Sequence, residues 1–390
     1  MQLQTLKSII VEKITNSPQQ RITFAEYMDQ VLYHPQYGYY SSGTVKIGAD
    51  GDFFTSSSLG ADFGELLAEQ FVEMWQNIGH PATFTLVEMG AGSGILAVDI
   101  LNYLQQQYPD FFIILEYIIV EQAQGLIQQQ QQLLEEHKLN EKVQFFTDLE
   151  NIPEESIIGC FFSNELIDAF PVHRIKLIQG KIQEIYLSYV NEKFVELTDE
   201  PSNTQLIKYF DLVGVDLFSN SYPEEYFTEV NLVALKWLAT VARCLKRGYV
   251  LTIDYGYSAQ NYYHPQRYQG TLQCYYQHRF NDNPYANIGH QDITTHVDFT
   301  ALENYGKLCG LEELGNTKQG MFLMALGLGK RLNSLSSGKY NAMEIIKRRD
   351  ALHQLINPIG LGKFGVLLQS KGLKANEKKI LKGFQLPNRY

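Results

Sequence analysis

A glycine-rich segment, Val87-Glu-Met-Gly-Ala-Gly-Ser-Gly94, has residue types and spacing that could do chemistry. It follows the apolar run Phe84–Met89, which predicts a strand, and precedes Ile95–Gln107, whose apolar spacing predicts a helix. Glycines let the backbone turn sharply and approach a ligand closely, and the helix points its first N–H groups at the same place. The segment therefore predicts a ligand crevice at the carboxyl end of a strand. Its glycines are Gly90, Gly92 and Gly94.

The spacing of these glycines favours one cofactor over another. Dinucleotide-binding loops follow GxGxxG, but here the third glycine comes one residue early and Ile95 stands where that pattern has glycine. GxGxG with an acidic residue, Glu88, two positions before it resembles the first motif of class I methyltransferases. Their sulfonium cofactor has no pyrophosphate and needs close backbone approach and nearby carboxylates instead. We therefore expect S-adenosyl-L-methionine rather than NAD, with a purely structural turn as the alternative.

Two further carboxylates stand at the ends of expected strands. Glu121 follows the apolar run Ile113–Val120, where an acidic side chain can bond a ribose diol. Asp148 follows the run Val143–Phe146 and could reach an adenine. Both are expected cofactor contacts, and the alternative for each is an ordinary exposed carboxylate.

The segment Ser163-Asn-Glu-Leu-Ile-Asp-Ala-Phe-Pro-Val-His173 begins where the fourth strand should end, facing the transferred group. Glu165 and Asp168 are three residues apart, so one helical turn would place both carboxylates on one face. Such a pair, with Asn164 beside it, can clamp a guanidinium and hold the charge that develops during transfer. The alternative is that Asn164 and Glu165 only cap a helix.

Two His-x-Asp units, His290 to Asp292 and His296 to Asp298, follow a tyrosine-rich stretch. His and Asp are metal ligands, but no other strong His or Cys cluster accompanies them, so no metal is expected. We instead expect His296 and Asp298 to line the substrate side or to cap the helix expected at Phe299–Cys309.

Apolar patterning predicts the elements that position these residues. Strands are also expected at Ile157–Ser163 and Tyr249–Asp254, and a helix at Gln122–His137. Strands alternating with helices are typical of a doubly wound α/β sheet, so the fold class is α/β and Rossmann-like.

Other parts of the chain extend this core. Residues 172–198 alternate in the manner of strands, with Gly180 and Asn191 at turns. Residues 224–246 predict a long helix, and residues 311–315 and 321–327 predict two strands.

These patterns divide the chain into five parts: an N-terminal cap (1–80), a cofactor-binding core (81–171), a β insertion (172–223), the remainder of the core with substrate-side loops (224–330) and a C-terminal helical tail (331–390). The glutamine run Gln128–Gln132 lies within an expected helix, and we expect it to form a solvated helix face.

Composition excludes several classes of protein. The 390 residues include 43 acidic and 32 basic ones, giving a net charge of −11, and nucleic-acid binding needs a basic face. No apolar stretch is long enough for a membrane span, and the N-terminus lacks the pattern of a targeting segment, so a cytoplasmic protein is expected. The four cysteines, Cys160, Cys244, Cys274 and Cys309, form no CxxC pair and are expected to be reduced and mostly buried.

Several segments, taken in order, resemble the MidA-like family of class I methyltransferases, and together they are more specific than the glycine loop. They include FAEYMDQVLYHPQYGYY (24–40), GDFFTS (51–56), FGELLAEQ (63–70), VEMGAGSG (87–94), IIVEQ (118–122), NELIDAFPVH (164–173), IDYGY (253–257), GTLQCYYQH (270–278), DITTHVDF (292–299), QGMFLMALG (319–327) and LINPIGLGKFGVLLQSKGL (355–373).

The resemblance implies a protein arginine methyltransferase that forms symmetric dimethylarginine, on the omega nitrogens, on a subunit of respiratory complex I (an NADH dehydrogenase) and supports its assembly. It adds a segment near the methionine end of the cofactor: Gly51, Asp52, Phe53, Thr55 and Ser56. Two departures stand out. The loop reads GAGSG where the family usually has Pro and Arg at the variable positions, and Ser57-Ser58 replaces a common Pro-Glu, which removes a possible carboxylate.

Three points stay open from the sequence. The acceptor could be another protein side chain or a small molecule, and the chain could bind the cofactor without turnover as an assembly factor. The aromatic segment Tyr33–Tyr40 could form a lid or an arginine slot, or it could pack the N-terminal cap on the core.

Overall fold

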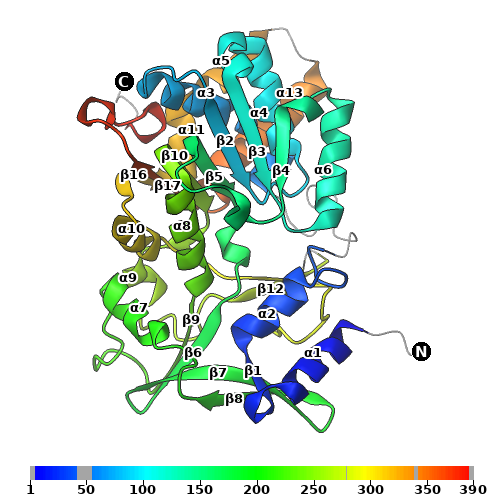
Figure 1. Cartoon of the computed structure of the whole chain (residues 1–390), viewed down its shortest axis with the longest axis vertical. Coiled ribbons are helices and arrows are strands. Elements are labelled where there is room, and N and C mark those ends of the chain that lie inside the picture. Colours follow the sequence, from blue (N-terminus) through cyan, green and yellow to red (C-terminus); the bar gives the residue numbers. More distant parts are fainter. Residues whose placement is uncertain (1–4, 42–54, 278, 338–340, 386–390) are drawn as a thin grey trace. The chain divides into compact units, whose positions relative to one another are not determined.

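A seven-stranded sheet has the order β16-β17-β10-β5-β2-β3-β4, with apolar runs inside and the polar strand β16 at one edge, as the computed structural model shows (Figure 1). The structure describes residues 5–41, 55–277, 279–337 and 341–385. The chain divides into two compact units, each made of discontinuous segments. We call the first the sheet unit (47–166, 239–255 and 306–390) and the second the cap unit (1–46, 167–238 and 256–305).

Five strands of the sheet unit run parallel, and β17 runs antiparallel between β10 and β16. The strands are β2 (Phe84–Met89), β3 (Leu115–Val120), β4 (Val143–Phe146), β5 (Ile157–Asn164), β10 (Leu245–Asp254), β16 (Glu312–Lys318) and β17 (Gly365–Lys371). Every residue of β2 is buried, as expected for a central parallel strand that is covered on both faces. The expected α/β fold class is therefore confirmed.

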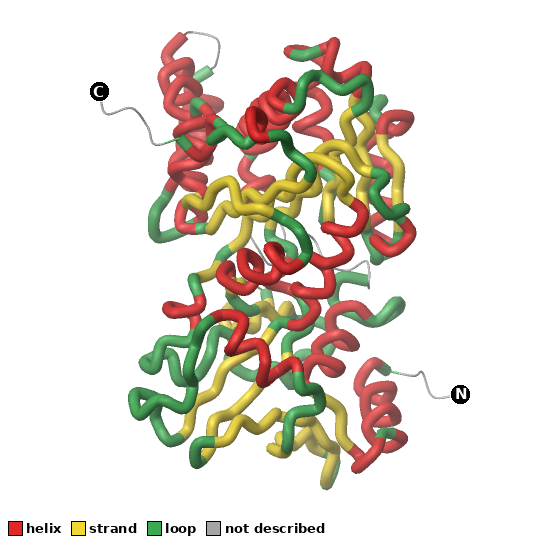
Figure 2. Tube along the Cα trace, turned by 60° about the vertical axis from the view of Figure 1, so that its left-hand side comes forward, coloured by secondary structure: helices red, strands yellow, loops and turns green. Residues whose placement is uncertain are grey.

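Helices pack around this sheet and share one hydrophobic core with it (Figure 2). They are α3 (Asp62–Asn77), α4 (Ile95–Gln107), α5 (Pro109–Ile114), α6 (Gln124–Glu136), α11 (Gln319–Leu326), α12 (Leu328–Ser334) and α13 (Ala342–Ile356). No helix among the described residues is long and apolar enough to cross a bilayer.

Three expectations for the sheet unit were wrong. Residues 321–326 belong to helix α11, which Gly327 ends and whose apolar run is too uniform to show a period. The expected strand Ile113–Val120 starts two residues late, because Pro109 opens the short helix α5. The tail contains β17, a buried apolar strand within a region expected to be helical.

The cap unit is built on a second, antiparallel sheet of five strands. They are β1 (Arg21–Thr23), β6 (His173–Ile178), β7 (Lys181–Val190), β8 (Lys193–Asp199) and β9 (Glu225–Val230). Gly180 and Asn191 have φ of 71° and 49° at the two hairpin turns, as the sequence predicted. The boundary between the units, after residue 46, falls inside the segment 1–80 that the sequence groups as one cap.

The expected long helix over residues 224–246 was wrong at its start. Residues 225–230 form β9, which pairs with β6, and the helix α8 covers only Leu232–Cys244. In the segment Glu-Tyr-Phe-Thr-Glu-Val the first four residues alternate in burial and the last three are all buried, and its aromatic and β-branched residues favour a strand.

Smaller elements complete the cap unit. Its helices are α1 (Leu6–Asn16), α2 (Phe24–Tyr33), α7 (Gln205–Val213), α9 (Ala259–Tyr262) and the start of α10 (Phe299–Leu308). Its short strands are β11 (Gly256–Tyr257), β12 (Gln273–Tyr276), β13 (Arg279–Asn281), β14 (Asp292–Thr294) and β15 (Val297–Asp298).

The aromatic segment Tyr33–Tyr40 packs within the cap unit. Tyr33 stacks on Tyr40 with ring centroids 5.5 Å apart, and the Tyr40 hydroxyl donates to Asp292 at 2.8 Å. Tyr39 is buried in the hydrophobic cluster of α1 and α2. These contacts favour the packing role over an arginine slot.

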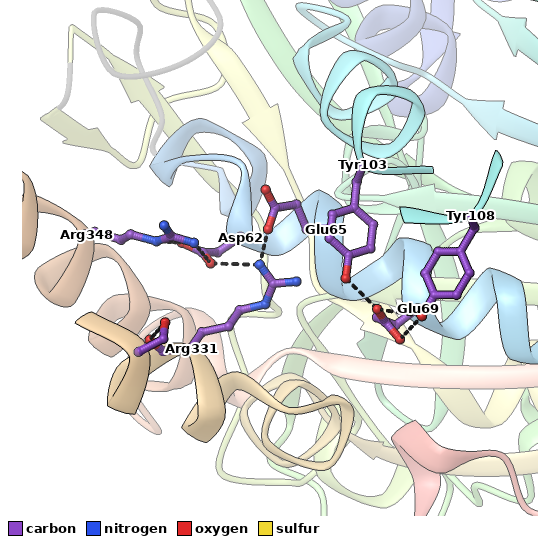
Figure 3. A network of polar contacts seen from close by, with 8 residues as sticks. Asp62, Glu65, Glu69, Tyr103, Tyr108, Arg331 and Arg348 are labelled. Atoms are coloured by element: carbon purple, nitrogen blue, oxygen red, sulfur yellow. Dashed lines mark hydrogen bonds and ion pairs between the residues drawn. The ribbon is translucent and has the colours of Figure 1, made fainter. Parts of the chain in front are cut away.

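A polar cluster fastens the C-terminal helices α12 and α13 to the start of α3 (Figure 3). Arg348 binds the carboxylate of Asp62 through two N–H groups, both at 2.7 Å. Arg331 donates to Asp62 at 3.1 Å and to Glu65. Asp62 is only 7% exposed, so its charge depends on these partners. Farther along α3, Glu69 accepts hydrogen bonds from two tyrosines, Tyr103 and Tyr108.

We predict that Asp62→Asn lowers the free energy of unfolding by about 2 kcal/mol, because two guanidinium groups then lose a buried anionic partner. The control is Asp350→Asn on α13, since the Asp350–Arg349 pair is 3.8 Å long and more than half exposed and should change stability by less than about 0.5 kcal/mol. Thermal and urea unfolding measure both effects, and equal stabilities of the two variants would contradict the anchoring role.

Candidate functional site

The glycine loop has the backbone that the sequence predicted. Gly90, Gly92 and Gly94 have φ of 67°, 54° and 80°, a region in which side chains cause strain. A Cβ at Gly90 would lie 2.7 Å from the Leu166 side chain, and one at Gly94 would lie 3.0 Å from Gln130. Gly94 is also the N-cap residue directly before α4. The loop is therefore a narrow cradle at the amino end of a helix, where backbone N–H groups can approach a ligand.

Glu88 lies beneath this loop and is only 3% exposed. Its carboxylate accepts a 2.7 Å hydrogen bond from the hydroxyl of Tyr117 on the neighbouring strand β3. Burial raises the pKa of Glu88 to about 7, against the lowering effect of the Tyr117 bond and with a smaller raising effect of the Glu121 charge.

Glu121 directly follows β3 at the same edge of the sheet. Its carboxylate accepts from the backbone N–H of Ala123 at 3.0 Å and from the side-chain amide of Gln130 at 3.5 Å. Burial raises the pKa of Glu121, although these bonds favour its ionised form. Asp148, in contrast, is exposed and accepts from Glu150 N–H at 2.9 Å, which caps the turn Leu149–Asn151.

The turn after β5 is held by the end of β10, the strand beside β5 in the sheet. Glu165 has a left-handed φ of 53°, and its N–H donates to Ile253 at 2.9 Å. The N–H of Leu166 donates to the carboxylate of Asp254 at 3.2 Å, and Asp254 is fully buried. This places the Leu166 side chain under Gly90.

The side chain of Glu165 joins the turn to the segment around Ser56. Its Oε1 accepts from Ser56 N–H at 3.1 Å and from the amide of Asn164 at 3.2 Å. The Ser56 hydroxyl in turn donates to Gln319 on α11 at 3.2 Å. Ser58, one of the two serines that depart from the family pattern, donates to the carbonyl of Thr55 at 2.8 Å. Gly51, Asp52 and Phe53 lie outside the described residues.

The expected helical turn through Glu165 and Asp168 was wrong. The 3-10 turn covers Ile167–Ala169, after the left-handed Glu165. Glu165 belongs to the sheet unit and Asp168 to the cap unit, because the boundary falls between Leu166 and Ile167. Asp168 is 6% exposed, and its carbonyl accepts from Thr295 N–H at 2.9 Å.

His296 and Asp298 lie in the cap unit. The His296 ring stacks on Tyr257 with centroids 4.8 Å apart, and the guanidinium of Arg267 lies 4.2 Å from the Tyr257 centroid. Asp298 accepts from Ala301 N–H at 3.2 Å, so its expected helix-capping role is confirmed. Burial raises the pKa of Asp298 to about 7. No three His, Cys, Asp or Glu side chains in the described part of the chain are grouped to bind a metal ion.

Sequence reasoning missed three residues of this site. Asp254 and Gln319 lie in segments that resemble the family, but no role was predicted for either of them. Gln130 was expected to be exposed to solvent. All three are at most 1% exposed. A buried polar residue within an apolar run is the signal that could have found Asp254, because such groups need a partner.

Comparisons with known proteins agree with this geometry. A model of S-adenosyl-L-methionine-dependent methyltransferases, Methyltransf_28, matches residues 66–317. The protein named "Protein arginine methyltransferase NDUFAF7 homolog, mitochondrial" from Drosophila melanogaster is 28% identical over 91% of this chain and 82% of its own length. Its namesake from Mus musculus is 28% identical over 80% of this chain and 72% of its own length.

A solved structure matches both units of the chain. A COG1565 superfamily member from Burkholderia thailandensis, bound to S-adenosyl-homocysteine, superposes with a TM-score of 0.84. It is 30% identical and covers 97% of this chain and 94% of that one. The expected class I methyltransferase fold is therefore confirmed.

The buried position of Glu88 predicts a pH dependence of stability. Unfolded, Glu88 ionises near pH 4.5, whereas in the fold it keeps its proton to about pH 7. The folded chain thus binds more protons between these values, and stability falls as pH rises, by roughly 3 kcal/mol at about 1.4 kcal/mol per pKa unit.

Urea unfolding of the cofactor-free protein from pH 5 to 8 tests this, and Glu88→Gln should flatten the decline. Tyr117→Phe should extend the decline to higher pH, because it removes the bond that favours the ionised carboxylate. An unchanged slope in Glu88→Gln would assign the decline to other groups.

Proposed function

Because this chain belongs to the family of S-adenosyl-L-methionine-dependent methyltransferases that matches residues 66–317, we propose that it methylates arginine side chains of a protein. The proposed product is symmetric dimethylarginine, on the omega nitrogens, on a subunit of a respiratory NADH dehydrogenase of the complex I type, in support of its assembly. One observation carries the proposal. Relatives named protein arginine methyltransferases match over 80–91% of this chain, well beyond the methyltransferase core.

S-adenosyl-L-methionine is the cofactor, and the residues of the sheet unit fit it. Gly90, Gly92 and Gly94 give the loop a backbone with positive φ that side chains rarely adopt, and a Cβ at Gly90 or Gly94 would press on Leu166 or Gln130. Glu121 holds a carboxylate at the end of β3, where it can accept both hydroxyls of a ribose. The cofactor supplies an electrophilic methyl group on a sulfonium, and we assign Asp148 to the adenine side and the segment 51–56 to the methionine side.

The proposed acceptor, a guanidinium, stays protonated near neutral pH, so the site has to align it rather than deprotonate it beforehand. Glu165 and Asp168 are two separate candidates for holding N–H groups of the guanidinium and directing the remaining nitrogen. As the nitrogen–carbon bond forms, the carbon–sulfur bond breaks and its electron pair stays on sulfur. The nitrogen then releases a proton, which Glu165 or Asp168 accepts.

Other side chains are proposed to act beside the two candidate carboxylates. Asn164 and the Ser56 N–H both donate to Oε1 of Glu165, at 3.2 and 3.1 Å, and so hold the carboxylate in one orientation. We assign His296, which is stacked on Tyr257, to the acceptor side. The relatives are named mitochondrial. For this chain we propose a cytoplasmic setting of the bacterial type, with a protein substrate as its partner.

We predict that the protein binds S-adenosyl-L-methionine and S-adenosylhomocysteine in calorimetric titration and that Gly92→Arg abolishes both, because the φ of 54° at Gly92 strains any side chain and so distorts the loop. Gly79→Arg is the matched control. Gly79 also has a positive φ, 85°, but faces open space at the end of α3. Loss of binding in both variants would point to misfolding, and retention in both would remove the loop from the cofactor site.

A second prediction separates chemistry from structure at Glu165. Glu165→Gln keeps an oxygen that can accept from Ser56 and Asn164, so cofactor affinity and melting temperature should stay near the wild-type values. Its turnover should fall by about 100-fold or more, because the anionic group is gone. Glu165→Ala should lose both turnover and the tether to Ser56.

The assay follows methyl transfer from labelled cofactor to candidate NADH dehydrogenase subunits, with mass spectrometry of the arginines. Full turnover in Glu165→Gln and Asp168→Asn would remove both carboxylates from the mechanism. Methylation of a lysine or a small molecule would change the acceptor class. Cofactor binding with no transfer to any acceptor would favour a non-catalytic assembly factor.

A further inference from the structure

The glutamine run in α6 contains one residue unlike its neighbours. Gln128, Gln129, Gln131 and Gln132 are exposed, whereas Gln130 is 0% exposed. Gln130 shares its helix face with the buried Leu126, Ile127 and Leu134. This is the face on which an amphipathic helix carries apolar residues, and a buried amide there costs free energy unless its hydrogen bonds are made.

The amide of Gln130 reaches two parts of the cofactor site. Its Nε2 donates to the carbonyl of Gly92 at 2.8 Å and approaches the Glu121 carboxylate at 3.5 Å, the long end for a hydrogen bond. Its Cγ lies 3.0 Å from the place where a Cβ on Gly94 would be. The same side chain therefore contacts the glycine loop and the carboxylate that faces the ribose.

We propose that Gln130 is a positioning residue for S-adenosyl-L-methionine, which ties the Gly92 carbonyl and the Glu121 carboxylate together so that both are set before the cofactor arrives. The inference rests on cofactor binding at the glycine loop and not on which acceptor is methylated. Gln130 acts through Gly92 and Glu121 and is not itself a catalytic residue.

The chemistry of the amide fits this role better than other side chains would. An NH₂ group has two N–H donors, one for each of the two acceptors, and it carries no charge. A carboxylate at the same place would face two acceptors and repel Glu121. The hydrogen bond from Gln130 also favours the ionised form of Glu121, against the burial that raises the pKa of that carboxyl.

The test uses Gln130→Met, which keeps the length and unbranched shape of the side chain and removes its donors. Gln129→Met, one position along the same helix and exposed, is the matched control. Calorimetric titration with S-adenosylhomocysteine from pH 5.5 to 8.5 should show about tenfold weaker binding for Gln130→Met and wild-type binding for Gln129→Met. Gln130→Glu should bind more weakly still.

A pH profile distinguishes this role from simple support of the fold. Glu121 without its Gln130 partner should hold its proton to a higher pH. Because the ionised carboxylate accepts the ribose hydroxyls, the pH below which cofactor affinity declines should be higher in Gln130→Met than in the wild type. The melting temperature of the cofactor-free variant should not fall, because methionine suits the apolar helix face. In a Glu121→Gln background, Gln130→Met should weaken binding less than it does in the wild type.

Three outcomes would overturn the inference. One is a Gln130→Met variant that binds like the wild type with the same pH profile. Another is a variant whose affinity loss only follows a lower melting temperature. The third is a wild-type protein that does not bind the ligand, which would refute both cofactor binding and the role of Gln130. If the wild type binds the ligand and the Gln130 variants bind it equally well, only the role of Gln130 is refuted.

Discussion

The buried carboxylate of Asp254 holds the turn on which the rest of the site depends. Asp254 ends β10, and its two oxygens accept the N–H groups of Leu166 and Tyr255 at 3.2 and 2.8 Å. Because β10 and β5 are adjacent parallel strands, this ties two strand ends together across the sheet. Leu166 then supports Gly90 of a third strand end, and the turn keeps Glu165 in its left-handed conformation. A backbone conformation of this kind persists only where the surrounding structure enforces it.

The same sheet edge gathers three buried carboxyl groups. Glu88, Glu121 and Asp254 are each at most 9% exposed, and they lie at or next to the carboxyl ends of β2, β3 and β10. Burial raises the pKa of Glu88 and of Glu121, which means that ionising them costs free energy in the cofactor-free protein. The hydrogen bonds that Glu88 accepts from Tyr117 and that Glu121 accepts from Ala123 and Gln130 offset part of that cost.

How much of this could be predicted depends on the range of the interactions that decide each feature. The strand Phe84–Met89, the helix Ile95–Gln107 and the strand Val143–Phe146 have the predicted bounds, because local apolar patterns determine them. The strands β9 and β17 pair with β6 and β10, which are distant in the sequence. The local apolar pattern does not show this pairing. The role of Gln130 depends on Gly92, which is 38 residues away. Each unit is made of several separate segments, so a division of the sequence into consecutive parts cannot reproduce the units. The sequence therefore did not predict the boundary after residue 166, which separates Glu165 from Asp168.

The C-terminal elements belong to the frame of the site rather than to an appended tail. Ser56 bonds both Glu165 and Gln319, and Gln319 is buried and bonds the carbonyl of Leu355 in α13 at 3.3 Å. The short helix that begins at Ser56 packs against α13, which Asp62 and Arg348 fasten to α3. The position of Glu165 therefore depends on residues far beyond 317, where the family model ends. A chain that kept only the matched core would retain the glycine loop and lose the support behind the carboxylate.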